Sequence, residues 1–219
     1  MALQEFDTKG FGQLECSQTW FNRAGMVEAQ CHLDPDKFAA NFPMTSAEAG
    51  ANKIYGEVGA FLMVDKQNKI ATIPNKDMSD LGYPMGINYS TEKNYNQFTP
   101  GRRNFCMIAG EYLPRIGYTE PGMRICTNTV MWEDTKFPVD ATSKVSPSVQ
   151  MYQAVKNALA TDPTTPIYAV VTNDSNGKLV IGADIDDAIG DVYAQVVQAY
   201  TNADTTLAFK IQFIRKPVA

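Results

Sequence analysis

"LAFKIQF", residues 207–213, carries the clearest alternation in the chain. Large apolar side chains occupy every second position, namely Leu207, Phe209, Ile211 and Phe213. The positions between them hold Ala208, Lys210 and Gln212. Because successive side chains of a β-strand point to opposite faces, this period of two predicts a strand with one buried face. Its partner is expected just upstream, so that residues 191–214 form a final strand pair.

Two further segments predict hairpins. In the first, "GAFLMVD" (59–65) and "KIATIP" (69–74) flank a polar turn at 65–68. In the second, "TPIYAVVTNDSNGKLVIGAD" (165–184) has the pair Asn176–Gly177 at its centre. Asn-Gly is favoured in hairpin turns because both residues adopt positive φ with little cost.

The segment "YLPRIGYTEPGMRICTNTV" (112–130) contains another turn followed by another strand. The Pro121–Gly122 turn opens a run in which Met123, Ile125, Thr127 and Thr129 fall on one side. The segment Gly86–Tyr89 and a short apolar run at 105–109 add to the series. Turn signals about every ten residues with short strands between them predict a mainly β fold, a small β-barrel or sandwich.

One amphipathic helix is predicted at about 146–160, in "SPSVQMYQAVKNALATDP". Ser146 is a suitable N-cap, and Pro147 suits the first helical position. An apolar stripe recurs at helical spacing, formed by Met151, Tyr152, Val155, Ala158 and Leu159. Because only one face is apolar, we expect the helix to pack on the neighbouring sheet as an insert in the β-rich domain at 54–219.

Residues 1–53 contain aromatic side chains without a clear period, so we interpret them as an extended N-terminal arm. Such a segment often needs another surface to cover it. The alternative is that it folds back over its own domain. Within it, 26–33 is predicted to be one strand, Asp34–Pro35 to begin a helical turn, and 45–53 to be a loop.

The net charge of −5 and the pI of about 4.9 argue against a nucleic-acid partner, which requires clustered Lys and Arg. No run approaches 18 apolar residues, and no apolar leader opens the chain, so we expect no membrane partner and synthesis in a cytoplasm. Four cysteines lie far apart without a Cys-x-x-Cys pair and are expected to be buried thiols. Cys106 and Cys126 could lie on neighbouring strands.

Few residues predict catalysis. His32 is the only histidine, and it stands beside Cys31 on a predicted strand without a nucleophile elbow. A structural zinc would need Cys16, Cys31, His32 and one more ligand, at a spacing unlike that of zinc fingers. Asp184, Asp186, Asp187 and Asp191 could hold calcium, but their spacing departs from the EF-hand loop, and a solvated acidic loop is the preferred interpretation.

The sequence contains no phosphate-binding loop, dinucleotide fingerprint or HExxH motif. Carboxylates paired only in the fold stay open, as do aromatic residues that could stack on sugars: Trp20, Tyr89, Tyr95 and Trp132. We therefore expect a chain that is not an enzyme, with no catalytic residues, no cofactor and no metal ion.

Several stretches together resemble virion structural proteins of tailed bacteriophages, in particular capsid decoration (cement) or head auxiliary proteins. They are "GAFLMVDKQNKIATIP", "GINYSTEKNYNQFTPGRRNFCMIAGEYLPRIGY", "PGMRICTNTV", "TTPIYAVVTNDSNGKLVIGA" and "LAFKIQFI". They cover roughly residues 54–133 and 165–214. The resemblance implies a protein that binds the outside of an assembled head through the major capsid protein and stabilises the shell. It further implies a homo-oligomer on the capsid exterior, assembled in the host cytoplasm.

In that case the aromatic residues of the arm are the candidate capsid contacts: Phe6, Phe11, Trp20 and Phe21. Two other functions stay open at this point. One is a β-sandwich carbohydrate-binding or adhesion module of a phage tail or fibre, which would present aromatic side chains in a groove. The other is an enzyme with two facing carboxyl groups in a cleft.

Overall fold

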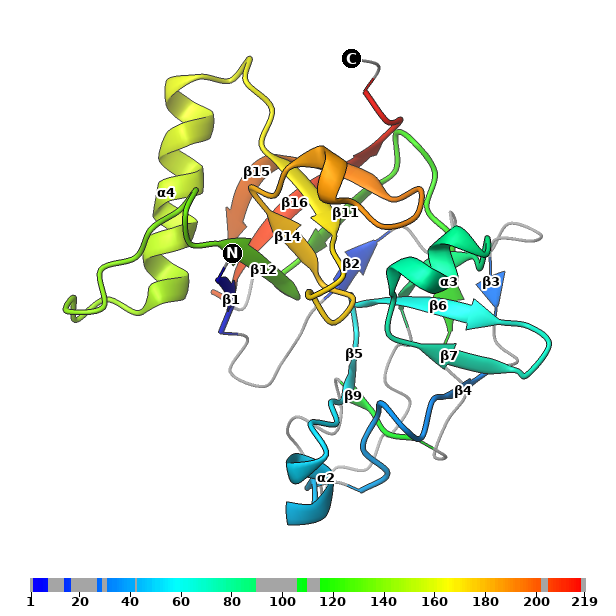
Figure 1. Ribbon diagram of the computed structural model, residues 1–219. Helices are drawn as coiled ribbons and strands as arrows, with labels where there is room; N and C mark the ends of the chain where they lie inside the picture. Colours follow the sequence, from blue (N-terminus) through cyan, green and yellow to red (C-terminus); the bar gives the residue numbers. More distant parts are fainter. Residues whose placement is uncertain are drawn as a thin grey trace.

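The computed structural model describes residues 2–7, 14–16, 27–28, 31–41, 43–89, 106–109, 115–201 and 205–217. Its strands form an eight-stranded sheet, a six-stranded sheet and a two-stranded pair of β5 (Gly56–Glu57) with β9 (Cys106–Met107) (Figure 1). The chain is therefore mainly β, and the prediction of its fold class is confirmed.

The eight-stranded sheet is built around the alternating stretch at 207–213. Its strands in spatial order are β1 (Leu3–Glu5), β12 (Val130–Glu133), β14 (Leu179–Ile181), β13 (Tyr168–Val171), β15 (Tyr193–Thr201), β16 (Leu207–Ile214), β11 (Arg124–Thr127) and β2 (Leu14–Cys16). The pairings are antiparallel except that of β12 with β14. The alternation correctly predicts β16, because Phe209, Ile211 and Phe213 are buried while Lys210 and Gln212 are partly exposed.

This sheet must curl. β11 and β12 are five strand spacings apart in the sheet, about 24 Å if it were flat. Yet only Asn128 and Thr129 separate Thr127 from Val130, and three Cα steps reach at most about 11 Å. The short link therefore holds the sheet in a half-closed barrel.

The six-stranded sheet contains β3 (Val27–Glu28), β10 (Ile116–Gly117), β8 (Met85–Asn88), β6 (Phe61–Asp65), β7 (Ile70–Thr72) and β4 (His32–Leu33) in spatial order. The predicted hairpin at 59–74 is confirmed, since β6 pairs antiparallel with β7. β3 and β4 hold opposite edges although four Cα steps join Glu28 to His32, a reach of about 14 Å at most. This sheet therefore curls as well.

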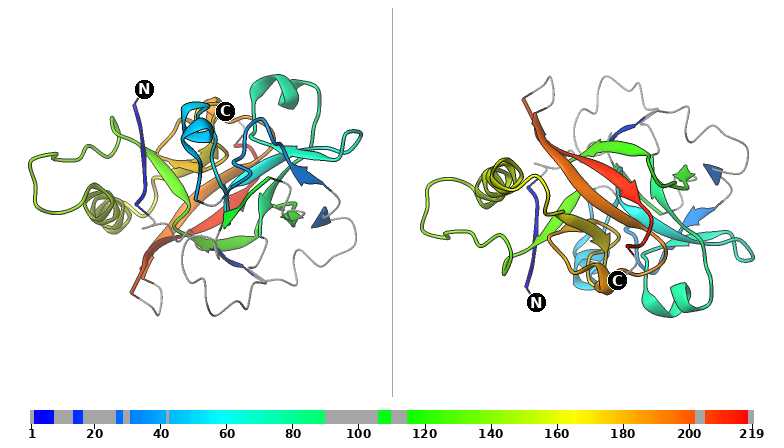
Figure 2. Two further views of the ribbon diagram at one scale, coloured as in Figure 1. Left: turned by 90° about the horizontal axis from the view of Figure 1, so that it is seen from below. Right: turned by 90° about the horizontal axis from the view of Figure 1, so that it is seen from above.

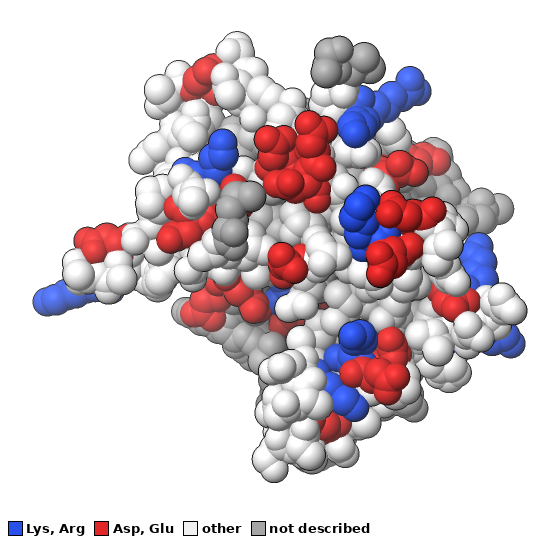
Figure 3. All heavy atoms as spheres, in the orientation of Figure 1, with Lys and Arg blue, Asp and Glu red and all other residues white. Residues whose placement is uncertain are grey.

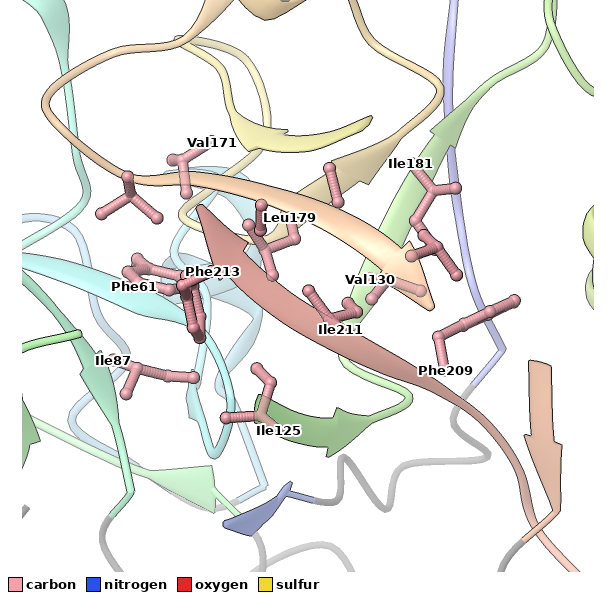
Figure 4. Packing of buried hydrophobic residues seen from close by; sticks show 14 of the residues in the cluster. Phe61, Ile87, Ile125, Val130, Val171, Leu179, Ile181, Phe209, Ile211 and Phe213 are labelled. Carbon is pink, nitrogen blue, oxygen red and sulfur yellow. The ribbon is translucent and has the colours of Figure 1, made fainter. Parts of the chain in front are cut away.

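The two sheets share one core. Phe61 and Met63 on one face of β6 join the side chains of the eight-stranded sheet, where the rings of Phe61 and Phe213 lie 6.1 Å apart (Figure 4). Leu62 and Val64 on the other face belong to a second cluster. β6 is thus buried on both faces, which explains its uninterrupted apolar run.

The predicted helix is confirmed as α4 (Pro147–Thr161), and it packs beside β15 and β16 (Figures 1 and 2). Met151, Tyr152 and Val155 are buried. Tyr152 lies 5.8 Å from the Phe209 ring, and its hydroxyl is 3.2 Å from Thr201 Oγ1. Ser146 occupies the N-cap position, but its side chain makes no capping hydrogen bond.

In the described parts of residues 1–53, four short strands pair with the two main sheets, while the division of the chain into an arm and a β-rich domain stays a prediction. β1 and β2 are the two outermost strands of the eight-stranded sheet, and β3 and β4 are those of the six-stranded sheet. All four edges of the main sheets are therefore held by strands from residues 3–33. The prediction of one strand at 26–33 is wrong, because β3 and β4 lie at opposite edges of their sheet.

Two smaller predictions also need correction. Residues 45–53 were expected to be a loop, but they contain the helix α2 (Ser46–Gly50). Thr45 and Glu48 form a capping box, in which each side chain binds the backbone N–H of the other. Cys106 and Cys126 do not lie on neighbouring strands, since Cys106 pairs with Glu57 while Cys126 pairs with Lys210 and Glu15.

Candidate functional site

A cleft of about 810 Å³ opens between the two sheets. One wall is formed by α3 (Lys76–Asp80) and residues 82–85. The opposite wall is formed by residues 186–192, which run from the 3-10 turn η2 (Ile185–Asp187) to the residue before β15. Tyr118, Thr119 and Asn173 complete the lining.

Side chains from the loops and turns around the cleft position its walls. Asn75 caps α3 by accepting from Met78 N at 2.9 Å, and Lys76 N donates to Asn173 Oδ1 at 3.2 Å. The second bond joins α3 to the hairpin loop between β13 and β14. The Tyr118 ring lies 5.9 Å from Lys66 Nζ, a cation–π distance that orients the ring.

The cleft is acidic, because four aspartates and one lysine line it: Asp80, Asp186, Asp187, Asp191 and Lys76. Lys76 pairs with Asp80 at 3.3 Å, and Lys216 lies 3.9 Å from Asp186. Figure 3 shows acidic side chains gathered on this face of the molecule. Carboxylates, an amide and two tyrosines suit a polyhydroxylated or cationic ligand held by hydrogen bonds and ring contacts.

The structure does not gather the four aspartates that suggested calcium. Asp184 uses its carboxylate to accept from Asp186 N at 3.2 Å and thereby caps η2. Within the described ranges, no three His, Cys, Asp or Glu side chains are grouped as a metal ion requires. The acidic segment therefore serves as a wall of the cleft.

A second polar group lies where the sheets are joined, and sequence reasoning missed it. Lys178 is only 7% exposed, and its ammonium lies 2.7 Å from Oε2 of the buried Glu57. The same ammonium pairs with Glu5 of β1. This group, which we call the junction triad, ties together the β13–β14 hairpin, the two-stranded pair and the N-terminal strand. A pocket of about 180 Å³, which Tyr55 and Asn176 also line, lies beside it.

Residues 127–130, "TNTV", join β11 to β12 and make further hydrogen bonds near the junction triad. Thr129 Oγ1 donates to Val58 O at 2.7 Å, and Thr129 N donates to Thr127 Oγ1 at 3.0 Å. Phe61 N donates to Gly177 O at 2.7 Å. The threonines that the sequence places on one side of a strand are buried hydrogen-bonding groups rather than surface residues.

Of the four candidate capsid-contact residues, the structure describes Phe6 alone. Phe6 is 3% exposed and packs edge-on against Phe209 at 5.5 Å, so its ring belongs to the core and is not available at the surface. Phe11, Trp20 and Phe21 lie outside the described residues. Of the proposed sugar-stacking residues, Tyr89 and Trp132 are buried, and Trp20 and Tyr95 fall outside the described ranges. His32 is exposed on β4.

The clearest pKa shifts belong to carboxylates that cap turns. The backbone N–H of Thr45, more than any other partner, lowers the pKa of Glu48 from 4.5 to about 2, assisted by Ala40 N and the side chains of Thr45 and Asn41. The hydroxyls and amides of Thr164 and Thr165 similarly lower the pKa of Asp162 well below its usual range. These carboxylates stabilise local structure and lie outside the cleft.

No protein-family model matches the chain, and comparisons with curated proteins and with solved structures find no significant match. Among the described helices, none combines the length and apolarity needed to span a bilayer.

Proposed function

We propose that the chain is a structural protein of a tailed-phage virion that binds the exterior of the assembled head and stabilises the capsid shell. The observation that carries the proposal is the position of β1 to β4, which form the outer edges of both main sheets. The outer side of an edge strand carries main-chain N–H and C=O groups that have no partner within the sheet. Another protein chain can pair with these groups.

The buried polar residues support the same proposal. The junction triad ties the eight-stranded sheet to the two-stranded pair through ion pairs, and the Thr129 hydroxyl donates to Val58 O. Such groups add geometric rigidity to the joint. A rigid body suits a protein that must bridge neighbouring shell subunits.

The free energy of binding would come from apolar surface buried across the interface between neighbouring shell subunits. Apolar area removed from water contributes about 25 cal/mol per Å² before the costs of ordering and association. On a symmetric shell the contact is repeated, so a modest affinity per site is multiplied when copies are linked. The partner proposed here is the major capsid protein, with the chain bound as a homo-oligomer.

The proposal is tested by co-sedimentation. Heads purified from the phage source of the chain, stripped of the protein, are mixed with the purified chain and pelleted. We expect saturable binding with a fixed number of copies per shell and a raised temperature of head disruption. Chain that stays in the supernatant at every concentration would contradict the proposal.

The cleft favours a second candidate, a carbohydrate-binding or adhesion module of a tail or fibre. Tyr83 and Tyr118 line it together with Asn173 and several carboxylates, the side chains that commonly hold sugars. A glycan array with the purified chain tests this candidate. Binding that is lost in Tyr83→Ala and kept in Tyr55→Phe, a change outside the cleft, would favour it over head binding.

A further inference from the structure

Residues 3–7 bind the body of the protein as a short peptide would, and we call them the N-terminal clip. Leu3 packs against the cluster that contains Met131 and Val180, and the Phe6 ring enters the main core. Glu5 pairs with the ammonium of Lys178. Asp7 N donates to Ser148 Oγ at 2.6 Å.

The groove that receives the clip is built entirely from distant parts of the chain. Its floor is the edge of β12, with Leu3, Gln4 and Glu5 in register with Glu133, Trp132 and Met131. Phe6 N donates to Val130 O at 3.1 Å. Its walls are Ser148 at the start of α4, Lys178 and Phe209. Since all these residues lie between 130 and 209, the groove has the same shape whichever copy of the chain supplies the strand.

We infer that the clip is exchanged between copies of this chain when copies are concentrated, so that residues 3–7 of one copy occupy the groove of the next. The contacts are the same in both arrangements, and the choice is therefore set by effective concentration. An empty groove would leave the β12 edge unpaired, which is unfavourable, so each groove recruits a clip from one source or the other.

The sheet topology shows where an exchanged clip stays attached to its own copy. The next described segment after the clip is β2, which holds the opposite edge of the same sheet. A clip that leaves its own groove thus stays attached at the edge farthest from that groove in the strand order. Two copies that exchange clips reciprocally form a closed dimer, and exchange passed from copy to copy forms rings or longer assemblies. The inference stands apart from head binding, because it needs only the chain itself.

A disulfide placed across the clip tests the exchange. Leu3 and Glu133 are register partners, so Leu3→Cys/Glu133→Cys links the clip to whichever groove holds it. The variant is unfolded, refolded at a series of protomer concentrations, oxidised, and resolved by denaturing electrophoresis without reductant. We expect linked monomers in dilute samples and linked dimers and larger species in more than half of the material at high concentration. Linked monomers at every concentration would overturn the inference, and so would the absence of any linkage.

Two controls keep the result specific. Gln195→Cys/Gln212→Cys joins β15 to β16 within one hairpin and should stay monomeric throughout. Equal oligomer formation by this control would count against exchange. Phe6→Ala in the clip-linked variant removes the anchoring ring and should reduce linked oligomers at least fivefold. The hairpin disulfide, installed separately in Phe6→Ala, reports that the body has folded, and undiminished oligomers in that folded body would overturn the inference.

Discussion

The ammonium of Lys178 lies 2.7 Å from the carboxylate of Glu57, and both side chains are almost fully buried where the eight-stranded sheet meets the two-stranded pair. Their positions are 121 residues apart in the chain. A buried cation is tolerated only where carboxylates compensate it, so this contact fixes how the β13–β14 hairpin meets the two-stranded pair.

Removing one partner of that contact should be costly. Lys178→Met leaves the Glu57 carboxylate buried without its cation, and we expect a loss of about 3–5 kcal/mol in the free energy of unfolding. Urea denaturation measures it. Lys76→Met is the matched control, because its ion pair with Asp80 is exposed and should contribute about 0.5 kcal/mol or less. A double change, Lys178→Met with Glu57→Leu, should recover most of the loss.

The turn at Gly177 should tolerate no side chain. Its φ is +80°, and an added Cβ would lie 2.2 Å from Phe61 O. Gly177→Ala is therefore expected to cost about 3 kcal/mol or more by clash and backbone strain. Gly122→Ala has a similar φ of +93° but open space around it, and should cost about 1 kcal/mol. If thermal unfolding showed equal losses of stability in the two variants, the close approach of Gly177 to Phe61 of β6 would be contradicted.

Phe6 should behave as a core residue. Phe6→Ala removes a buried ring from the main cluster, and a loss of about 3 kcal/mol in unfolding free energy is expected. Leu81→Ala, at a side chain that is 76% exposed, should change stability by less than about 0.5 kcal/mol. If Phe6→Ala were as harmless as the control, the ring would not be buried in solution.

Acid should weaken the chain through its capping carboxylates. The pKa of Glu48 is lowered from 4.5 to about 2. A carboxyl whose folded pKa is depressed contributes its full stability above the unfolded value, and loses that contribution as pH falls from about 4.5 towards 2. The free energy of unfolding should therefore decrease as the pH is lowered across this range. The free energy of unfolding of the Glu48→Gln variant should decrease less steeply. A slope identical to that of the unchanged chain would contradict the assigned role of Glu48.

Local pattern predicted much of the β framework. The alternation at 207–213, the polar turn at 65–68 and the Asn176–Gly177 pair each specify a strand or hairpin through neighbouring residues. α4 was predictable for the same reason, because its apolar stripe from Met151 to Leu159 recurs over about two and a half helical turns. α2 could also have been found, since Thr45 and Glu48 have the spacing of a capping box.

The rest depends on contacts that no local pattern encodes. β1 to β4 are two or three residues long, too short for a period to appear, and their partners lie far along the chain. Glu57 and Lys178 look like ordinary surface charges until the fold brings them together. The cleft likewise forms only when α3 meets residues 186–192, so its tyrosines and aspartates could not be grouped from sequence.

Electron microscopy of the native particle tests the central proposal most directly. A reconstruction of the virion of the proposed phage source should show density that fits the two curled sheets on the outer surface of the head, repeated with the symmetry of the shell. Density for this fold at the tail tip or on a fibre, or its absence from the purified particle, would contradict the proposal.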